Sequence, residues 1–88
     1  MELGVIIQRL YESEINCEVT TFWDAGLTVK LGDNANGFVA ETEVRTSEEA
    51  ARWLDDAACR HFPESVYALG QPRWDQLNRE RGKLHRVK

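Results

Sequence analysis

Three times between residues 15 and 44 the chain alternates apolar and polar residues, and only short polar stretches separate the three segments. A period of two residues is typical of β-strands that bury one face. The first break is the turn sequence at 24–26, where Gly26 is expected to supply a positive φ, and the second is "GDNANG" at 32–37. Parallel strands need long crossover connections, whereas antiparallel strands need only a tight turn. The spacing therefore predicts a three-stranded antiparallel meander.

The alternation divides each predicted strand into an inward and an outward face. The inward positions are mostly apolar and are Ile15, Cys17, Val19, Thr21, Trp23, Leu27, Val29, Leu31, Phe38, Ala40, Thr42 and Val44. The outward positions mix acidic, basic and apolar side chains and are Glu18, Thr20, Phe22, Thr28, Lys30, Val39, Glu41 and Glu43. We expect Trp23, and Trp53 in the segment that follows the strands, to anchor the core. We expect the net acidic outward face to meet either water or a partner.

An amphipathic helix is predicted on each side of the strands. Apolar residues spaced three and four apart over residues 2–13 form one helical stripe. A second stripe runs over residues 50–62, and Pro63 ends it. Thr46 followed by Glu49 is the pattern of a capping box at the start of this second helix.

These elements predict one α+β domain. We expect an α-β-β-β-α two-layer sandwich in which both helices cover one face of the antiparallel meander, plus a C-terminal extension. Eighty-eight residues suffice for a single domain with one core. We place the domain at residues 1–70, with an irregular segment at 63–70. The basic extension is at 71–88, where Pro72 is suited to begin a short third helix.

Charge is distributed unevenly between these two parts. Residues 1–70 hold thirteen acidic and five basic residues, a net charge of −8, whereas residues 71–88 hold six basic and two acidic residues, a net charge of +4. Basic residues interleaved with an aromatic, here Trp74, are found in proteins that bind single-stranded nucleic acids. Three outcomes fit this pattern: docking of the extension on an acidic domain, nucleic-acid binding, or a solvated tail. In the docked case we expect the tail cations to pair with Glu18, Glu41 and Glu43.

No motif in the sequence indicates a metal site. The loop at 33–37 has the composition of a calcium loop, but the third and twelfth positions hold Ala35 and Val44, which offer no side-chain oxygen. The cysteines and histidines form neither a C-x-x-C nor an H-x-x-x-H pair. They are Cys17, Cys59, His61 and His85. We expect two reduced, mostly buried thiols and no bound metal.

Catalytic chemistry is likewise not indicated. No nucleophile–base constellation can be assembled from the sequence, and phosphate-binding glycine loops are missing. The first residues lack a basic region and a cleavage site, and no run of about 18 apolar residues is present that could span a membrane. We therefore expect a cytoplasmic protein that is not an enzyme and needs no cofactor.

The order α-β-β-β-α over residues 2–62 resembles the topology of the double-stranded RNA-binding domain. That resemblance implies a basic cluster at the start of the second helix, where the phosphates of the duplex are held. Here the same place holds "TSEEAARW", and Glu48 and Glu49 would repel phosphate. The resemblance is one of topology without the basic motif, so binding to duplex RNA is not expected.

Two further resemblances rest on short motifs. The segment "TSEEAA" at 46–51 is similar to a helix start in HicB-type antitoxins, whose Pro-Asp-x-Pro-Gly loop is replaced here by "GDNANG". The segments "FWDAGLTVKLGDNANGFVAE" and "EEAARWL" resemble a family of short uncharacterised bacterial proteins of unknown function. The first resemblance implies an antitoxin-like regulator, and the second implies no particular chemistry.

Together these features predict a small non-catalytic protein–protein interaction module. We expect it to self-associate as a homodimer through the outward sheet face, the basic extension, or both. The alternative is an antitoxin-like or nucleic-acid-associated regulator that uses the basic extension; no membrane is expected as a partner. The residues expected to contact a partner are Glu18, Phe22, Lys30, Val39, Glu41, Glu43, Trp74, Arg79 and Arg81.

Overall fold

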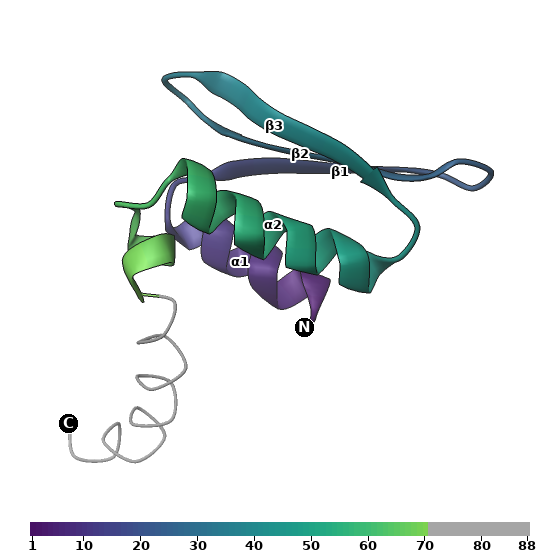
Figure 1. The fold of residues 1–88 in the computed structure, drawn as a ribbon, viewed down its shortest axis with the longest axis horizontal. Helices are drawn as coiled ribbons and strands as arrows, with labels where there is room; N and C mark the ends of the chain where they lie inside the picture. Colours follow the sequence, from purple (N-terminus) through teal and green to yellow (C-terminus); the bar gives the residue numbers. More distant parts are fainter. Residues whose placement is uncertain (71–88) are drawn as a thin grey trace, which may run out of the picture.

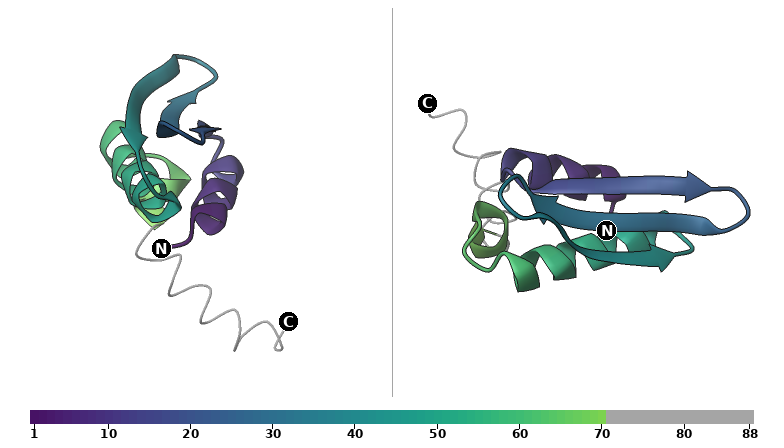
Figure 2. Two further views of the ribbon diagram at one scale, coloured as in Figure 1. Left: turned by 90° about the vertical axis from the view of Figure 1, so that its right-hand side faces the viewer. Right: turned by 90° about the horizontal axis from the view of Figure 1, so that it is seen from above.

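The computed structural model describes residues 1–70, which form a three-stranded sheet and, on one of its faces, a layer of helices (Figures 1 and 2). The strands are antiparallel in the order β1-β2-β3, so β2 is central. The elements in chain order are α1 (Leu3–Glu12), β1 (Asn16–Phe22), β2 (Gly26–Asp33), β3 (Gly37–Val44) and α2 (Ser47–His61). The predicted α+β class and the α-β-β-β-α order are confirmed. The third helix predicted from Pro72 lies outside the described residues.

The core lies between β2 and the two helices. Its largest aliphatic side chains are at most 2% exposed and are Ile6 and Leu10 of α1, Val29 and Leu31 of β2, and Leu54 of α2. Four alanines of α2 are also buried, and their small side chains let this helix lie close to the sheet. Burying one such leucine or isoleucine side chain contributes about 1.5–3 kcal/mol, so this cluster accounts for much of the fold's stability.

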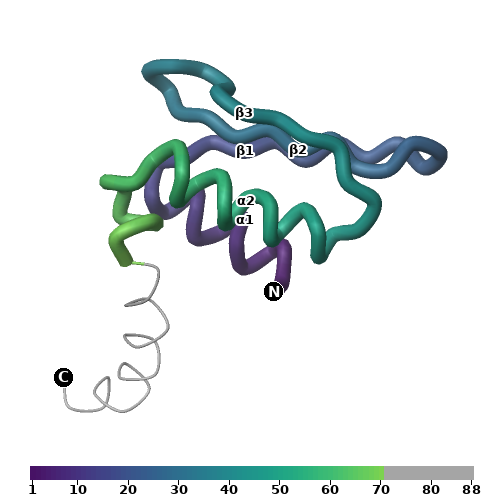
Figure 3. The backbone as a smooth tube through the Cα atoms, in the orientation of Figure 1, coloured from purple at the N-terminus to yellow at the C-terminus, as the bar shows by residue number. Residues whose placement is uncertain are grey.

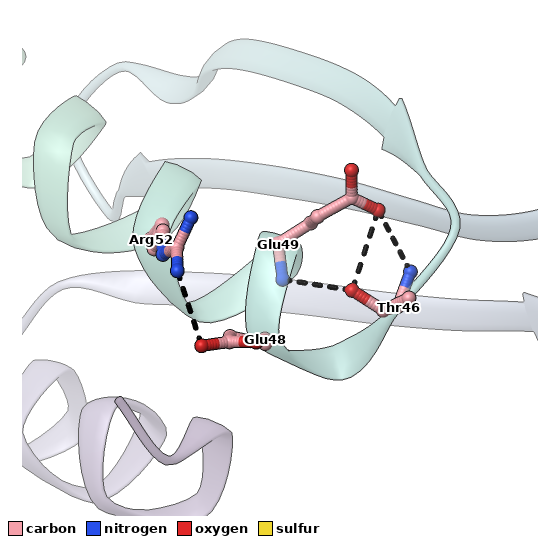
Figure 4. A network of polar contacts seen from close by, with 4 residues as sticks. All are labelled: Thr46, Glu48, Glu49 and Arg52. Atoms are coloured by element: carbon pink, nitrogen blue, oxygen red, sulfur yellow. Dashed lines mark hydrogen bonds and ion pairs between the residues drawn. The ribbon is translucent and has the colours of Figure 1, made fainter.

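The predicted capping box begins α2 (Figure 4). The Thr46 hydroxyl accepts a hydrogen bond from the Glu49 N–H at 3.1 Å, and Glu49 Oε1 accepts one from the Thr46 N–H at 3.0 Å. The same carboxylate accepts a hydrogen bond from the Arg45 N–H, and this bond is the main cause that lowers the pKa of Glu49. Donors at the end of the helix that would otherwise be unpaired are thus satisfied by the chain itself.

A tight turn connects α1 to β1. The Ile15 N–H donates to the Leu10 carbonyl at 2.9 Å, and the Glu14 N–H donates to the Tyr11 carbonyl at 3.1 Å. These two bonds form a Schellman motif, in which the residue with positive φ is usually glycine. Here Glu14 takes that conformation, with a φ of 64°. The turn places Ile15 in the core and fixes where β1 begins.

Both hairpins turn through three residues and close on a glycine with positive φ. The φ values are 94° at Gly26, as the sequence predicts, and 71° at Gly37. β2 is longer than its alternation indicates, because Gly32 and Asp33, predicted to lie in a loop, continue the strand. The Asp33 carboxylate then accepts a hydrogen bond from the Asn36 N–H at 2.7 Å, which closes the turn directly after the strand.

A β-bulge near the second hairpin moves Phe38 to the face opposite to the one predicted. The pairing shifts between Leu31 and Gly32, and Val39 is left as the extra residue of β3. Phe38 consequently faces outward, where the Lys30 amine lies 5.7 Å from the centre of its ring. The two strands approach so closely that a β-carbon on Gly32 would overlap the backbone of β3. A strict alternation gives no signal for an extra residue, which explains the error.

The prediction that Trp23 anchors the core is wrong. β1 ends one residue earlier, so Trp23 is the first residue of the turn, and its side chain is 99% exposed. The β1–β2 hairpin extends beyond the helix layer, which leaves no element of residues 1–70 to cover its tip (Figures 1 and 3). Trp53, the second predicted anchor, is partly buried and packs against the core.

The segment after α2 is more ordered than its sequence indicates. Residues 66–70 form a helical turn, and Tyr67 is the largest fully buried side chain of the described residues. Its hydroxyl donates a hydrogen bond to Asp55 Oδ1 on α2 at 2.7 Å. Burial, reinforced by the hydrogen bond and the charge of Asp55, raises the pKa of Tyr67 above its ordinary range. This contact joins the end of the described chain to the core.

Candidate protein-binding surface

The outer sheet face, which is the face turned away from both helices, carries polar residues of all three strands. Strand pairing places Glu18, Lys30 and Glu41 in one row across the sheet. The neighbouring row consists of Thr20, Thr28 and Glu43. Lys30 Nζ lies 3.7 Å from Glu18 Oε1, but both side chains are partly exposed, so this ion pair adds little to stability. Its charges remain available to a partner.

Exposed apolar side chains flank these polar rows at both ends of the sheet. Phe22, at the β1–β2 end, is 61% exposed, and Phe38, near the β2–β3 end, is 51% exposed. Val39 in the bulge is 39% exposed. No helix or strand of residues 1–70 covers the outer sheet face (Figure 2). Exposed aromatic and aliphatic groups around a polar patch are suited to binding another protein.

The structure brings most of the predicted contact residues together. Glu18, Lys30 and Glu41 form one row, and Glu43 lies in the next row. Phe22 lies on the same face, at its β1–β2 end. Val39 is the extra residue of the bulge in β3 and is 39% exposed. The other three predicted contact residues lie outside the described residues and are Trp74, Arg79 and Arg81. The pairing of the basic extension with the acidic residues of the sheet therefore stays a prediction.

Sequence reasoning misplaces two exposed aromatic residues, Phe38 on the outer sheet face and Trp23 at the tip of the first hairpin. The position of Phe38 depends on the bulge, for which the glycines on either side of the second turn are the only available hint. Trp23 directly precedes "DAG", so a turn that begins one residue earlier would have placed it outside the strand. Both errors come from continuing an alternation past the point where the strand changes.

The cysteines show no sign of reactivity. Cys17 and Cys59 are both free and half-buried. Burial raises the pKa of both thiols, and the charge of Asp55 adds to the increase at Cys59, so both stay protonated at neutral pH. Among residues 1–70, no three His, Cys, Asp or Glu side chains are grouped so that they could hold a metal ion.

Comparison with known proteins gives no family for this chain. No family model matches it, and no curated protein and no solved structure shows significant similarity to it. Within the described part of the chain, no helix has the length and apolar character needed to cross a membrane. Function must therefore be inferred from the surface itself.

Proposed function

We propose that this chain is a small non-catalytic protein–protein interaction module that associates through its sheet layer, with a second copy of the chain as the first candidate partner. The observation that supports this most is the exposure of Phe22 and Phe38 on a face that no element of residues 1–70 covers. Covering two such rings removes apolar surface from water, which favours association. The charged row between the two rings would orient the partner.

The charges of the outer sheet face favour a protein over a nucleic acid. Its two rows contain the carboxylates of Glu18, Glu41 and Glu43 but only one amine, that of Lys30. Such a face repels phosphate, and neutralisation of phosphate supplies most of the affinity of nucleic-acid-binding surfaces. A partner with basic and apolar groups would complement it.

The test replaces both Phe22 and Phe38 with serine in the full-length chain. Tyr11→Ser is the matched control, because Tyr11 is 77% exposed but belongs to α1 in the other layer. Each protein is immobilised, and its binding of soluble wild-type chain and of proteins from the native host is measured. We expect the double variant to lose binding that wild type and Tyr11→Ser retain. Equal binding by all three proteins would contradict the proposal.

A second candidate function is nucleic-acid-associated regulation through residues 71–88. The observation in its favour is the +4 charge of this segment around Trp74. Single-stranded RNA or DNA should then bind with an affinity that falls steeply as salt is added, measured by fluorescence anisotropy. Trp74→Ala should weaken this binding through lost base stacking. An absence of binding at low salt would exclude this function.

A further inference from the structure

We propose that two copies of the chain pair along the outer edge of β1, so that their three-stranded sheets become one continuous antiparallel sheet. This inference rests on the proposed function, because it takes the sheet layer as the region that associates. It deepens that function by naming the partner, a second copy, and the register in which the two strands meet.

The outer edge of β1 has backbone groups that a second strand can bond. β1 has a single neighbour, β2, among the strands of residues 1–70. The Phe22 carbonyl is turned toward the β2 side of the strand, since it accepts a hydrogen bond from the Ala25 N–H at 2.9 Å. Backbone direction alternates along an antiparallel strand, so every second residue before Phe22 also faces β2. The N–H and C=O groups turned to the open edge belong to Cys17, Val19 and Thr21.

The edge of β3 is protected against pairing and the edge of β1 is not. β3 contains the bulge at Val39 and exposes the charges of Glu41 and Glu43. Bulges and charged side chains are the devices by which edge strands avoid adding further strands. β1 has no bulge and no proline, and its one charged residue, Glu18, is already paired with Lys30. A second strand can therefore pair more readily with the edge of β1 than with the edge of β3.

β1 is complementary to a second copy of itself. The strand runs from residue 16 to 22, so full antiparallel overlap of two copies is centred on Val19. Val19 is turned to the open edge, which allows a hydrogen-bonded pair on the two-fold axis. In this register Glu18 lies opposite Thr20 of the second copy, so no like charges face each other directly. The register also buries the most strand length that β1 offers.

The helix layer covers only the first part of β1. On the face that packs against the helices, Ile15 is 4% exposed, Cys17 and Val19 are half-buried, and Thr21 is exposed. In the proposed register Thr21 lies beside Cys17 of the second copy, where the second copy's own α1 packs under the sheet. In the dimer, α1 of each copy thus lies near the end of the other copy's β1, which that copy's own helices leave uncovered.

The same register gives Trp23 a partner. Trp23 follows β1 directly and is almost fully exposed. In this register Phe22, the last residue of β1, lies opposite Asn16 of the second copy, so the adjacent Trp23 comes near the second copy's turn between α1 and β1. Tryptophans that are desolvated at interfaces contribute a disproportionate share of binding energy. Trp23→Ala should therefore weaken the dimer.

The first test compares Thr21→Pro with Glu43→Pro in the full-length chain. Both residues are exposed on edge strands. Leu27 pairs with Val44 and faces β3, so the alternation turns the Glu43 N–H to the open edge, as it turns the Thr21 N–H. Proline at either site therefore leaves the bonds of the sheet in place.

The two proline variants should differ in self-association. Thr21→Pro removes a donor to the second copy, and by symmetry it does so twice. In sedimentation equilibrium at about 0.15 M salt, we expect a dimer for wild type and for Glu43→Pro. For Thr21→Pro the loss of two hydrogen bonds should raise the Kd by about tenfold or more.

A second test does not depend on proline being tolerated. Single variants Glu18→Cys and Thr20→Cys are purified, mixed and oxidised. In the proposed register these positions form a non-hydrogen-bonded pair with α-carbons about 4.5 Å apart, which is close enough for a disulfide. We expect a cross-linked heterodimer in the mixed sample and far less in either sample alone. The native Cys17 and Cys59 are common to all samples and set the background.

The outcomes separate this inference from the proposed function. A monomeric wild type, a dimer that Glu43→Pro but not Thr21→Pro dissociates, or cross-linking no greater in the mixture would overturn the edge pairing. A dimer that survives Thr21→Pro and is lost in the Phe22→Ser/Phe38→Ser variant would overturn the edge pairing and leave the proposed function standing. If the dimer is lost in Thr21→Pro but kept in Phe22→Ser/Phe38→Ser, the edge pairing is supported and association through the outer sheet face is not.

Discussion

The two hairpins of this protein share one turn design but are stabilised differently. Each turns through three residues and closes on a glycine with positive φ, Gly26 in the first and Gly37 in the second. In the second hairpin the Asp33 carboxylate accepts hydrogen bonds from both the N–H and the side-chain amide of Asn36. The first turn is held by a backbone bond in which the Ala25 N–H donates to the last residue of β1.

The second hairpin lies at the end of the sheet that stabilises the fold, and the first hairpin lies at the end that is free to bind. At the second hairpin, the side chains of Asn16 and Asn34 are also hydrogen-bonded, at 2.7 Å, so this end links all three strands. The first hairpin presents Phe22 and Trp23 to solvent instead. Binding residues are commonly placed on turns that a rigid scaffold positions. We therefore expect the second hairpin to contribute mainly to stability and the first mainly to association.

The largest effect is expected for Gly32→Ala beside the second hairpin. The added β-carbon would overlap the carbonyl oxygen of Gly37, which is backbone and cannot rotate away. We expect the free energy of unfolding to fall by about 3 kcal/mol or more, measured by urea denaturation. Gly4→Ala in α1 is the control, because its added β-carbon meets no atom closer than 4.0 Å. If Gly32→Ala changed the free energy of unfolding as little as Gly4→Ala, the close approach of β2 and β3 at Gly32 would not constrain the fold.

Alanine at the two turn glycines separates the cost of positive φ from the cost of contact with a neighbouring strand. At Gly37 an added β-carbon would meet nothing within 4 Å, so Gly37→Ala should cost only the strain of positive φ, about 1 kcal/mol. At Gly26 it would also lie 2.6 Å from the Val44 carbonyl oxygen, so Gly26→Ala should cost more, about 2–3 kcal/mol. Urea denaturation of both variants measures the difference. The reverse order would show that turn strain, not strand contact, decides the cost.

Asp33, at the second turn, should contribute more to the free energy of unfolding than Asp24, in the first turn. Asp33→Ala removes the acceptor for Asn36 and should lower the free energy of unfolding by about 1 kcal/mol. Asp24→Ala changes an exposed residue of the first turn and should have an effect below about 0.5 kcal/mol. Thermal unfolding of the two variants side by side tests this. Equal losses would mean that the first turn is also stabilised by its side chains.

The smallest effect on folding is expected for Trp23→Ala. Its side chain lies in solvent, so at low protein concentration the free energy of unfolding should change by less than about 0.5 kcal/mol. At high concentration wild type should gain stability through self-association, and the variant should gain less. Thermal unfolding at two concentrations measures both. A large loss at low concentration would mean that the tip of the first hairpin packs against the domain.

The elements of the fold could be predicted because each has a local pattern. The Thr46–Glu49 capping box is a motif of only four residues that marks the start of α2, and Gly26 marks the first turn. The errors involve positions that depend on partners elsewhere in the chain. Phe38 changes face because the pairing shifts opposite Gly32, and Tyr67 is buried because it packs into a core cluster that includes residues of α2. Local periodicity contains no information about either contact.

The candidate surface could be predicted in part for the same reason. Alternation and pairing together place Glu18, Lys30 and Glu41 in one row, as the sequence indicates. The apolar part of the surface was less predictable, because the exposure of Trp23 depends on where β1 ends. Which edge of the sheet is free to pair also requires the strand order and the bulge.

Amide NMR of the full-length chain at increasing concentration tests the claim that this protein associates through its sheet layer. We expect chemical shifts to change with concentration along β1, above all at Val19 and Thr21, and on the outer sheet face. The amides in the middle of α2 should stay unchanged. Shifts that do not depend on concentration, or that change only in the helix layer, would contradict the claim.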